Sequence, residues 1–489
     1  MTSTFSPPET YRPSGGYRLL PFRFADLGSE RRLLVNEVGE HLRIRADDLE
    51  SLVAHTLDAH SDVYLDLKAR HFLFDSDSLA PFELLTAKYR TKKSFLDGFT
   101  QLHIFVISLR CEHSCIYCQV SRVSPDRQRY DMSAETASRS LDLVFRSPAQ
   151  QLKIEFQGGE PLLNFPRIRE IIEEAERRAA ATARPVEFVV TTNLALITDE
   201  MLSFFRDHDV FLSTSLDGPP FIHDANRPRP GNDSHARVVE NLERSRSALG
   251  HDRIAALMTT TSLSLQHPEA IVDEYLRLGF SAIFLRPISP YGFAVRTART
   301  TGYSMSEFLA FYVQALAHIL EINRRGTFFA EAYAQLLLRR IFTPFATAYV
   351  DLQSPAGAGI GVAVYNYDGN VYASDESRML AEMNDHRFRL GNVHRDAYED
   401  IFGGPIVRTL AASSVIESLP GCADCAFQPF CGSDPIFHYA TQGDVVGHQP
   451  TSEFHEKNEF LIKHLLELEE SDAHARRIFW SWITPESSS

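Results

Sequence analysis

The sequence lacks an uninterrupted apolar run long enough to span a membrane, which argues against a transmembrane segment. It also lacks an excess of basic residues: 49 Lys and Arg stand against 64 Asp and Glu, and the formal net charge is −15. An acidic chain of this kind disfavours a nucleic-acid backbone as its partner. Residues 1–16 contain no apolar core, so we expect a flexible leader there and no signal peptide. A cytoplasmic location without membrane attachment follows.

Cysteine is scarce, because 489 residues contain only six. A disulfide framework is not expected in a large chain without an export signal. All six fall into two groups of three, and none remains for an ordinary core position, which indicates that the thiols serve as ligands. The groups are Cys111, Cys115 and Cys118, and Cys422, Cys425 and Cys431.

The length and the 44% apolar content predict two or three structural units. From residue 101 to about 340, strand-like segments alternate with helical stretches such as 167–180. This alternation predicts a parallel α/β structure with its site at the C-terminal ends of the strands. The expected strands cover 102–108, 153–156, 186–191, 210–215, 254–260 and 282–285.

Apolar segments on either side of Gly39 predict a hairpin near the N-terminus. Leu49, Leu52, Val53 and Leu57 then recur at helical spacing, which predicts a helix. We therefore expect a small α+β unit before the alternating region.

Three thiols stand in the eight residues Cys111–Cys118, directly after the strand expected at 102–108. Three Cys ligands leave one iron of a [4Fe–4S] cluster open to a small molecule, whereas a zinc loop or a chance cluster would need nothing further downstream. The spacing, with Tyr117 before the last Cys, resembles the cluster loop of radical S-adenosylmethionine (SAM) enzymes. In that family the open iron binds the amino and carboxylate groups of SAM.

Other strand ends carry the same resemblance. Gly158-Gly159-Glu160-Pro161 is similar to the element that holds the SAM amino group, and 215–220 with 223–227 resembles the subgroup that modifies peptides and proteins. The resemblance implies that Arg237 pairs with the SAM carboxylate, with Arg227 the less favoured candidate, and that 284–287 packs near the adenine. The residues implied to contact SAM are Tyr117, Gly158, Gly159, Glu160, Asn193, Ser215, Asp217 and Arg237.

The second cysteine group resembles the SPASM domain of peptide-modifying radical SAM enzymes, which usually binds two further [4Fe–4S] clusters. No Cys lies between 118 and 422, so the inner of these clusters lacks its usual ligands. For the outer cluster, the resemblance implies a ligand set of Cys422, Cys425, Cys431 and His455. Zinc is the alternative metal for three Cys and one His, and His455 as a mere neighbour of the site is another interpretation.

Asp375 follows a hairpin expected around 367–372. It matches the position at which related sulfatase-maturating enzymes have a proton-accepting Asp, although a solvated loop is an alternative interpretation. The N-terminal unit loosely resembles the winged-helix modules that bind a leader peptide as an added strand. A plain structural cap on the barrel is the alternative for that unit.

The resemblance implies an α/β fold built on a partial (β/α)6 TIM-type radical SAM barrel. The expected organisation is a flexible leader over 1–16, an N-terminal α+β module over 17–100, the barrel over 101–340, a SPASM-like auxiliary-cluster domain over 341–460, and a C-terminal helix and tail over 461–489.

Several strings, Leu33–Glu40 among them, look most like the His-Xaa-Ser system radical SAM maturases. This implies a ribosomally made precursor peptide as substrate, a flavodoxin or ferredoxin-type electron donor, and an intrapeptide crosslink as product. Epimerisation or oxidation of one residue is the alternative radical outcome. A zinc-bound peptide-binding scaffold without radical chemistry is the alternative of another class.

Overall fold

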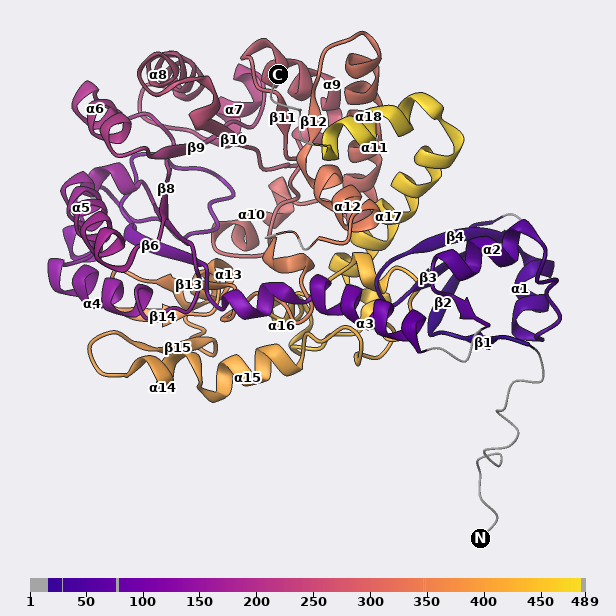
Figure 1. The fold of residues 1–489 in the computed structure, drawn as a ribbon. Coiled ribbons are helices and arrows are strands. Elements are labelled where there is room, and N and C mark those ends of the chain that lie inside the picture. The colour runs from indigo at the N-terminus through magenta and orange to yellow at the C-terminus, as the bar shows by residue number, and fades with distance from the viewer. Residues whose placement is uncertain (1–15, 29, 76–78, 346, 348, 485–489) are drawn as a thin grey trace.

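The computed structural model describes residues 16–484 except 29, 76–78, 346 and 348. The predicted leader 1–16 therefore lies outside the described residues, apart from Gly16. Figure 1 shows a curved sheet flanked by helices, with the N-terminal module to one side of it.

The alternating region forms a parallel sheet in which successive strands are neighbours. Its helices lie on the outer side of the sheet (Figure 1). The strands are β6 (Leu102–Ser108), β7 (Leu152–Gly158), β8 (Val186–Thr191), β9 (Phe211–Ser215) and β10 (Ile254–Leu257). The helices are α4 (Ala134–Val144), α5 (Phe165–Thr182), α6 (Asp199–Asp207), α7 (Pro220–Asn226), α8 (Ser234–Leu249) and α9 (Pro268–Arg277).

Apolar periodicity explains how these elements form. In α5, Ile168, Ile171, Ile172 and Ala175 are all buried against the sheet, and they are the residues whose spacing predicted a helix over 167–180. The strands β6 and β7 contribute Phe105 and Phe156 to the same core. Loops at the C-terminal ends of the strands are left free to carry polar side chains.

The last predicted strand, 282–285, departs from the expectation. Only Ala282–Ile283 is extended (β11), and it pairs in parallel with β12 (Ala330–Glu331) in a separate two-stranded sheet. The backbone N–H of Leu285 donates to the Glu331 carboxylate at 3.0 Å. This side-chain acceptor takes the place of the backbone carbonyl that a neighbouring strand would offer. The sixth strand is therefore short and detached from the main sheet.

The C-terminal segment completes the main sheet. Strand β13 (Val362–Tyr365) pairs in parallel with β6, and it begins the antiparallel series β13, β14 (Asn370–Tyr372) and β15 (Arg389–Asn392). The predicted hairpin around 367–372 is thus present. The barrel region and the segment after residue 341 share one sheet.

Helices form most of the remaining C-terminal half. Helix α11 is long and apolar enough to cross a membrane by length and composition, and 56% of its apolar window is buried inside the structure. The helices are α10 (Phe293–Thr301), α11 (Met305–Arg324), α12 (Ala332–Phe342), α13 (Asp375–Glu382), α14 (Tyr398–Phe402), α15 (Pro405–Ala412), α16 (Pro435–Gln442), α17 (Glu453–Ser471) and α18 (Ala473–Ile483).

The N-terminal module contains the predicted hairpin and helix. Helix α1 stops at Val53 and does not include Leu57, because His55 adopts a left-handed conformation with φ of 57°. The sheet order is β2-β3-β4, with β1 paired to β5. The elements are β1 (Arg18–Leu19), β2 (Phe22–Asp26), β3 (Arg31–Asn36), β4 (His41–Arg45), α1 (Ala46–Val53), α2 (Asp62–Ala69), β5 (Leu73–Phe74) and α3 (Ala80–Lys92).

Candidate metal and cofactor site

The first cysteine loop leaves the C-terminal end of β6, and backbone hydrogen bonds fix its course. The N–H of Ser114 donates to the carbonyl of Pro228 at 2.7 Å, and the N–H of Ile116 donates to the carbonyl of Asn226 at 3.0 Å. On the other side, the N–H of Phe293 donates to the carbonyl of Cys118 at 2.8 Å. The loop is therefore held between the segments that precede α8 and α10.

Gly158 and Gly159 bring the end of β7 directly against this loop. A Cβ atom at Gly158 would lie 1.9 Å from the carbonyl oxygen of Ser108, and one at Gly159 would lie 2.4 Å from that of Arg110. Gly158 also has a φ of +145°, which L side chains rarely adopt. The paired glycines are required because two backbones meet here without room for a side chain.

Glu160 lies beyond the glycines and is completely buried. Its carboxylate accepts hydrogen bonds from the Thr192 hydroxyl at 2.7 Å and from the Asn193 N–H at 2.9 Å. Burial, together with the charge of Glu112, raises the pKa of Glu160 to about 8. An ammonium group beside this carboxylate would stabilise its ionised form. The side chain is thus suited to accept from a cationic amine.

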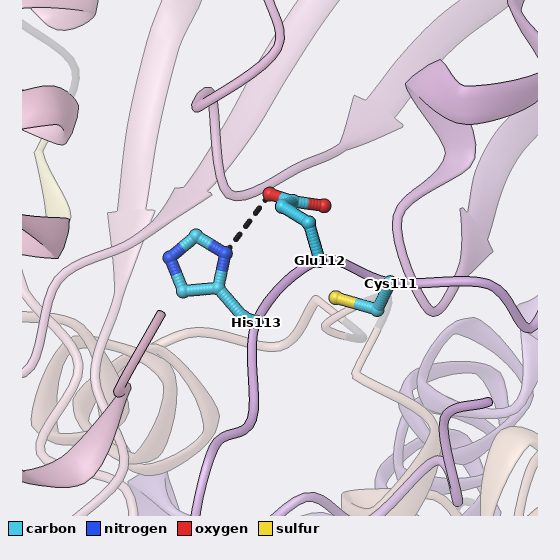
Figure 2. Close-up of side chains that lie close together, drawn as sticks. All are labelled: Cys111, Glu112 and His113. Atoms are coloured by element: carbon cyan, nitrogen blue, oxygen red, sulfur yellow. Dashed lines mark hydrogen bonds and ion pairs between the residues drawn. The ribbon is translucent and has the colours of Figure 1, made fainter. Parts of the chain in front are cut away.

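Figure 2 shows Glu112 and His113 in contact with each other beside Cys111. The side chain of Asn193 joins this pair. The Asn193 side-chain amide donates to Glu112 at 2.8 Å, and the His113 ring bonds the same carboxylate at 2.9 Å. The Cys111 sulfur, the Glu112 carboxylate and a His113 nitrogen lie within 4.8 Å of one another. Oxygen Oε2 of Glu112 is buried without a partner. The sequence analysis missed Glu112 and His113, because residues between the cysteines have no diagnostic spacing.

Tyr117 and Asp217 are brought together as buried partners. The Tyr117 hydroxyl donates to Asp217 at 2.7 Å, and the Arg227 guanidinium lies 3.1 Å from the same carboxylate. Arg227 also covers the Tyr117 ring, 5.3 Å from its centroid. Ser215 ends β9, two residues before Asp217.

Arg237, the favoured partner of the SAM carboxylate in the sequence analysis, has a different setting. It lies in the first turns of α8, its side chain is 40% exposed, and it pairs with Asp233 at 3.7 Å and Glu240 at 3.4 Å. Arg227, the less favoured candidate, is 12% exposed and borders the buried Tyr117 and Asp217. The contacts within the protein therefore place Arg227, and not Arg237, in the polar network behind the cysteine loop.

The first three thiols suit a metal cluster by their electrostatics. Burial raises the pKa of Cys115 to about 12, and the neighbouring Cys118 adds to this shift. Burial, Glu112 and Cys115 raise the pKa of Cys111 well above its usual value. Thiols in such a setting become thiolates only when a metal compensates their charge. The donor set and its close backbone cradle fit a bound iron–sulfur cluster.

The second group of thiols lies on the loop between α15 and α16. Burial raises the pKa of Cys422 to about 11 and that of Cys431 to about 12, and the charge of Cys425 contributes to both shifts. The buried guanidinium of Arg340 donates to the carbonyls of Phe430 at 2.8 Å and Cys431 at 3.0 Å. A cation of α12 thus holds the loop in place.

His455 lies on the first turn of α17, 28% exposed, with its Nε2 atom 3.0 Å from the Glu459 carboxylate. Glu459 in turn acts electrostatically on Cys425, so this face of α17 is turned toward the thiols. In the described part of the chain, His455 makes no hydrogen bond with any of the three sulfurs. Its role as a fourth ligand stays a prediction.

The spacing of the second group bears on the choice of metal. A tetrahedral zinc ion holds each sulfur at about 2.3 Å, which requires sulfurs less than about 4 Å apart. Among the residues that the structure describes, the second group does not bring three ligand atoms within 4.8 Å of one another. The sulfurs would have to come closer together to hold a single zinc ion, and zinc stays the alternative prediction for this group.

Asp375 is the first residue of α13, and its carboxylate forms an ion pair with Arg378. The fully buried guanidinium of Arg378 donates to it at 2.8 Å and also donates to the carbonyl of Val120 at 3.2 Å. This carboxylate is therefore held in a salt bridge within the protein. The adjacent Glu376 instead lines a cavity, together with Asp351 and Asp434.

The family model described as the Radical SAM superfamily matches residues 105–275. An uncharacterized protein of Methanothermobacter thermautotrophicus is 30% identical over 191 residues, which are 38% of this chain and 68% of that protein. The chain belongs to the radical SAM superfamily. Radical SAM enzymes use a [4Fe–4S] cluster and SAM, and the site described above fits both.

One match to a relative with a named activity is shorter. A serine-type anaerobic sulfatase-maturating enzyme of Bacteroides thetaiotaomicron is 27% identical over 139 residues, 28% of this chain and 33% of that enzyme. The chain thus matches about a third of that relative's length.

Solved structures of radical SAM proteins show the same fold. Native anSMEcpe with bound AdoMet matches with a TM-score of 0.60 at 16% identity, over 78% of this chain and 99% of the other. Streptococcus suis SuiB bound to precursor peptide SuiA matches with a TM-score of 0.50 at 14% identity, over 87% and 97%. The predicted radical SAM barrel with a SPASM-type C-terminal part is confirmed.

Proposed function

We propose that this protein is a radical SAM maturase that abstracts hydrogen from a residue of a ribosomally made precursor peptide and forms an intrapeptide crosslink. The observation that carries the proposal is the meeting of Gly158 and Gly159 with the cysteine loop. At this meeting the backbone N–H of the buried Glu160 donates to the carbonyl of Arg110, the residue before Cys111, and the Glu160 charge acts on the Cys111 thiol.

The peptide substrate is supported by the relatives. One relative matures sulfatases by name, and one structural neighbour is bound to a precursor peptide. A module of five strands and three helices precedes the barrel, and we assign to it recognition of the peptide. A cytoplasmic location and a flavodoxin or ferredoxin-type electron donor belong to the same proposal.

The residues of this chain have distinct roles in the proposal. Cys111, Cys115 and Cys118 would hold the [4Fe–4S] cluster, and Glu160 would accept from the amino group of SAM. The bound cluster and SAM supply an organic radical that can remove hydrogen from an unactivated carbon. The second cysteine group, with His455, would hold an auxiliary cluster, which would supply a site for the electron that is lost when the crosslink forms. Burial of Tyr117 and Asp217 excludes water from the network behind the loop.

The test is anaerobic co-expression with a short peptide encoded beside the gene, followed by mass spectrometry of the peptide. A crosslink removes two hydrogen atoms, whereas an epimer has an unchanged mass. We expect the loss of two hydrogens with the wild type and with Ser114→Ala, whose side chain is exposed within the same loop. Cys115→Ala should abolish the change. An iron-loaded protein that forms no deoxyadenosine from SAM and dithionite would overturn the proposal.

A further inference from the structure

A cavity with about 770 Å³ of empty space lies between the two cysteine groups. On one side, Tyr291 lines it, and the next residue, Gly292, runs so close to the first loop that a Cβ there would lie 2.7 Å from the Cys118 carbonyl oxygen. On the other side, Asp351 and Asp434 line it. The chain at Asp351 touches Gly432, the residue after Cys431. A molecule in this cavity would therefore be within reach of both groups.

Four carboxylates line this cavity, from Asp351, Glu376, Asp434 and Glu453. They come from four separate segments: the stretch before β13, the first turn of α13, the N-terminal cap of α16 and the first residue of α17. Burial and mutual repulsion raise the pKa of Glu376 to about 7 and that of Asp434 well above its usual value. A cation that entered the cavity would relieve this repulsion.

The cations already present do not neutralise the carboxylates by direct contact. Arg286 and Lys457 line the cavity. Among the described residues, neither forms an ion pair within 4 Å with any of the four acids. The ammonium of Lys457 lies instead over the Tyr333 ring, 4.5 Å from its centroid. Carboxylates thus outnumber cations four to two in the cavity wall.

A second observation indicates that the cavity takes a ligand. The hydroxyl of Tyr291 is without a hydrogen-bond partner, although this side chain is only 1% exposed, and its electrostatic neighbours are Asp434, Glu376 and Asp351. Buried hydroxyls are rarely left unpaired in a folded protein. Aromatic rings of Phe284, Tyr349 and Phe437 complete the wall. Acidic groups combined with aromatic faces are the surroundings that stabilise an organic cation.

We propose that this cavity binds the cationic side chain of a lysine, arginine or protonated histidine of the peptide substrate, with Asp351, Glu376 and Asp434 as its acceptors. The proposal rests on the peptide substrate of the proposed function and adds the class of residue that is placed between the two cysteine groups.

The test measures binding without relying on turnover. Fluorescein-labelled Ala-Lys-Ala and Ala-Arg-Ala are compared with Ala-norleucine-Ala and Ala-Glu-Ala by fluorescence anisotropy, with the anaerobic, iron-loaded protein and SAM. We expect the basic peptides to bind at least tenfold more tightly than the norleucine peptide. Glu376→Gln and Asp434→Asn should each reduce this preference severalfold, whereas Glu399→Gln, a 70% exposed acid on α14, should leave it unchanged.

The variants keep shape and local structure. An amide oxygen at position 434 still accepts from the N–H groups of Ile436 and Phe437, so the cap of α16 is retained. Equal binding of all four peptides, tighter binding of the glutamate peptide, or a preference that survives in both variants would overturn the proposal. Deoxyadenosine formation without peptide is measured on the same samples. Its absence from the wild type would contradict the proposed function, whereas the anisotropy alone decides the cavity.

Discussion

Arg227 and Arg237, the two candidate partners of the SAM carboxylate, differ in how deeply their side chains are buried. Arg227 lies 3.1 Å from the completely buried carboxylate of Asp217, so it compensates a charge that water cannot reach. Arg237 is partly exposed, and its partners Asp233 and Glu240 are exposed too. A side chain of the second kind is free to turn toward a ligand at little cost in folding energy.

Substitution of each arginine should therefore change a different quantity. We expect Arg227→Met to lower the free energy of unfolding by about 3–5 kcal/mol, because it leaves the buried carboxylate of Asp217 without a cationic partner. Arg237→Met should change it by less than about 1 kcal/mol. If Arg237 binds the SAM carboxylate, that variant should raise the SAM dissociation constant about tenfold, or about 1.4 kcal/mol.

Urea denaturation and equilibrium dialysis with SAM measure the two effects separately. Unchanged SAM affinity in Arg237→Met would contradict the sequence-based assignment and leave Arg227 as the partner of the carboxylate. Lys substitution at 237 is the matched control, since it keeps the positive charge but not the planar fork.

At the scale of elements, contiguous sequence motifs predicted where strands and loops lie. Pairings between residues far apart in the sequence could not be predicted. The cysteine spacing and the glycines after β7 are contiguous strings, so the sequence analysis could place them at strand ends. The detached strand β11 depends on Glu331, nearly fifty residues away, and no local pattern shows that bond. The cavity acids are spread over four segments in the same way, so no local pattern predicts that they line one cavity.

A histidine buried where β6 pairs with β13 should make the stability of the protein depend on pH. His103 of β6 is completely buried, and its Nδ1 atom lies 3.1 Å from the Tyr365 hydroxyl of β13. Burial lowers the pKa of His103 to about 3. Below its ordinary pKa of 6.5 the unfolded chain binds a proton that the folded chain does not. The stabilisation that comes from burying neutral His103 is thus fully present above pH 6.5, and it is lost as the pH falls toward 3.

We expect the wild type to lose about 2 kcal/mol more than His103→Gln between pH 6.5 and pH 5, because each pH unit is worth at most about 1.4 kcal/mol. Denaturation in urea at several pH values measures the slope. The control is His60→Gln, an exposed position that should keep the wild-type slope. Equal slopes for wild type and His103→Gln would show that His103 is protonated in the folded state.

At the scale of the whole molecule, the second cysteine loop is the meeting point of three parts of the chain. Helix α12 supplies Arg340 from the end of the barrel region. The N-terminal module supplies Arg23, which donates to the carbonyl of Ala423, and Lys93 just after α3, which pairs with Glu417. The sequence showed the thiols but not these supports, because no spacing rule connects residues so far apart. Cluster binding and the arrangement of the three parts should therefore depend on one another.

Arg340 offers the sharpest test of that dependence. Arg340→Met removes the donor to the carbonyls of Phe430 and Cys431, which are left buried, and we expect a loss of at least about 2 kcal/mol of stability. Because the loop also carries three thiols, iron per chain should fall by about half, to the amount of one cluster. Deoxyadenosine formation from SAM should persist, since the first cluster lies on a different loop. Arg339→Met, at the exposed neighbouring position of α12, should keep the full iron content. Full iron in Arg340→Met would show that the loop binds its metal independently of the barrel, and a fall in zinc instead of iron would show that zinc occupies this site.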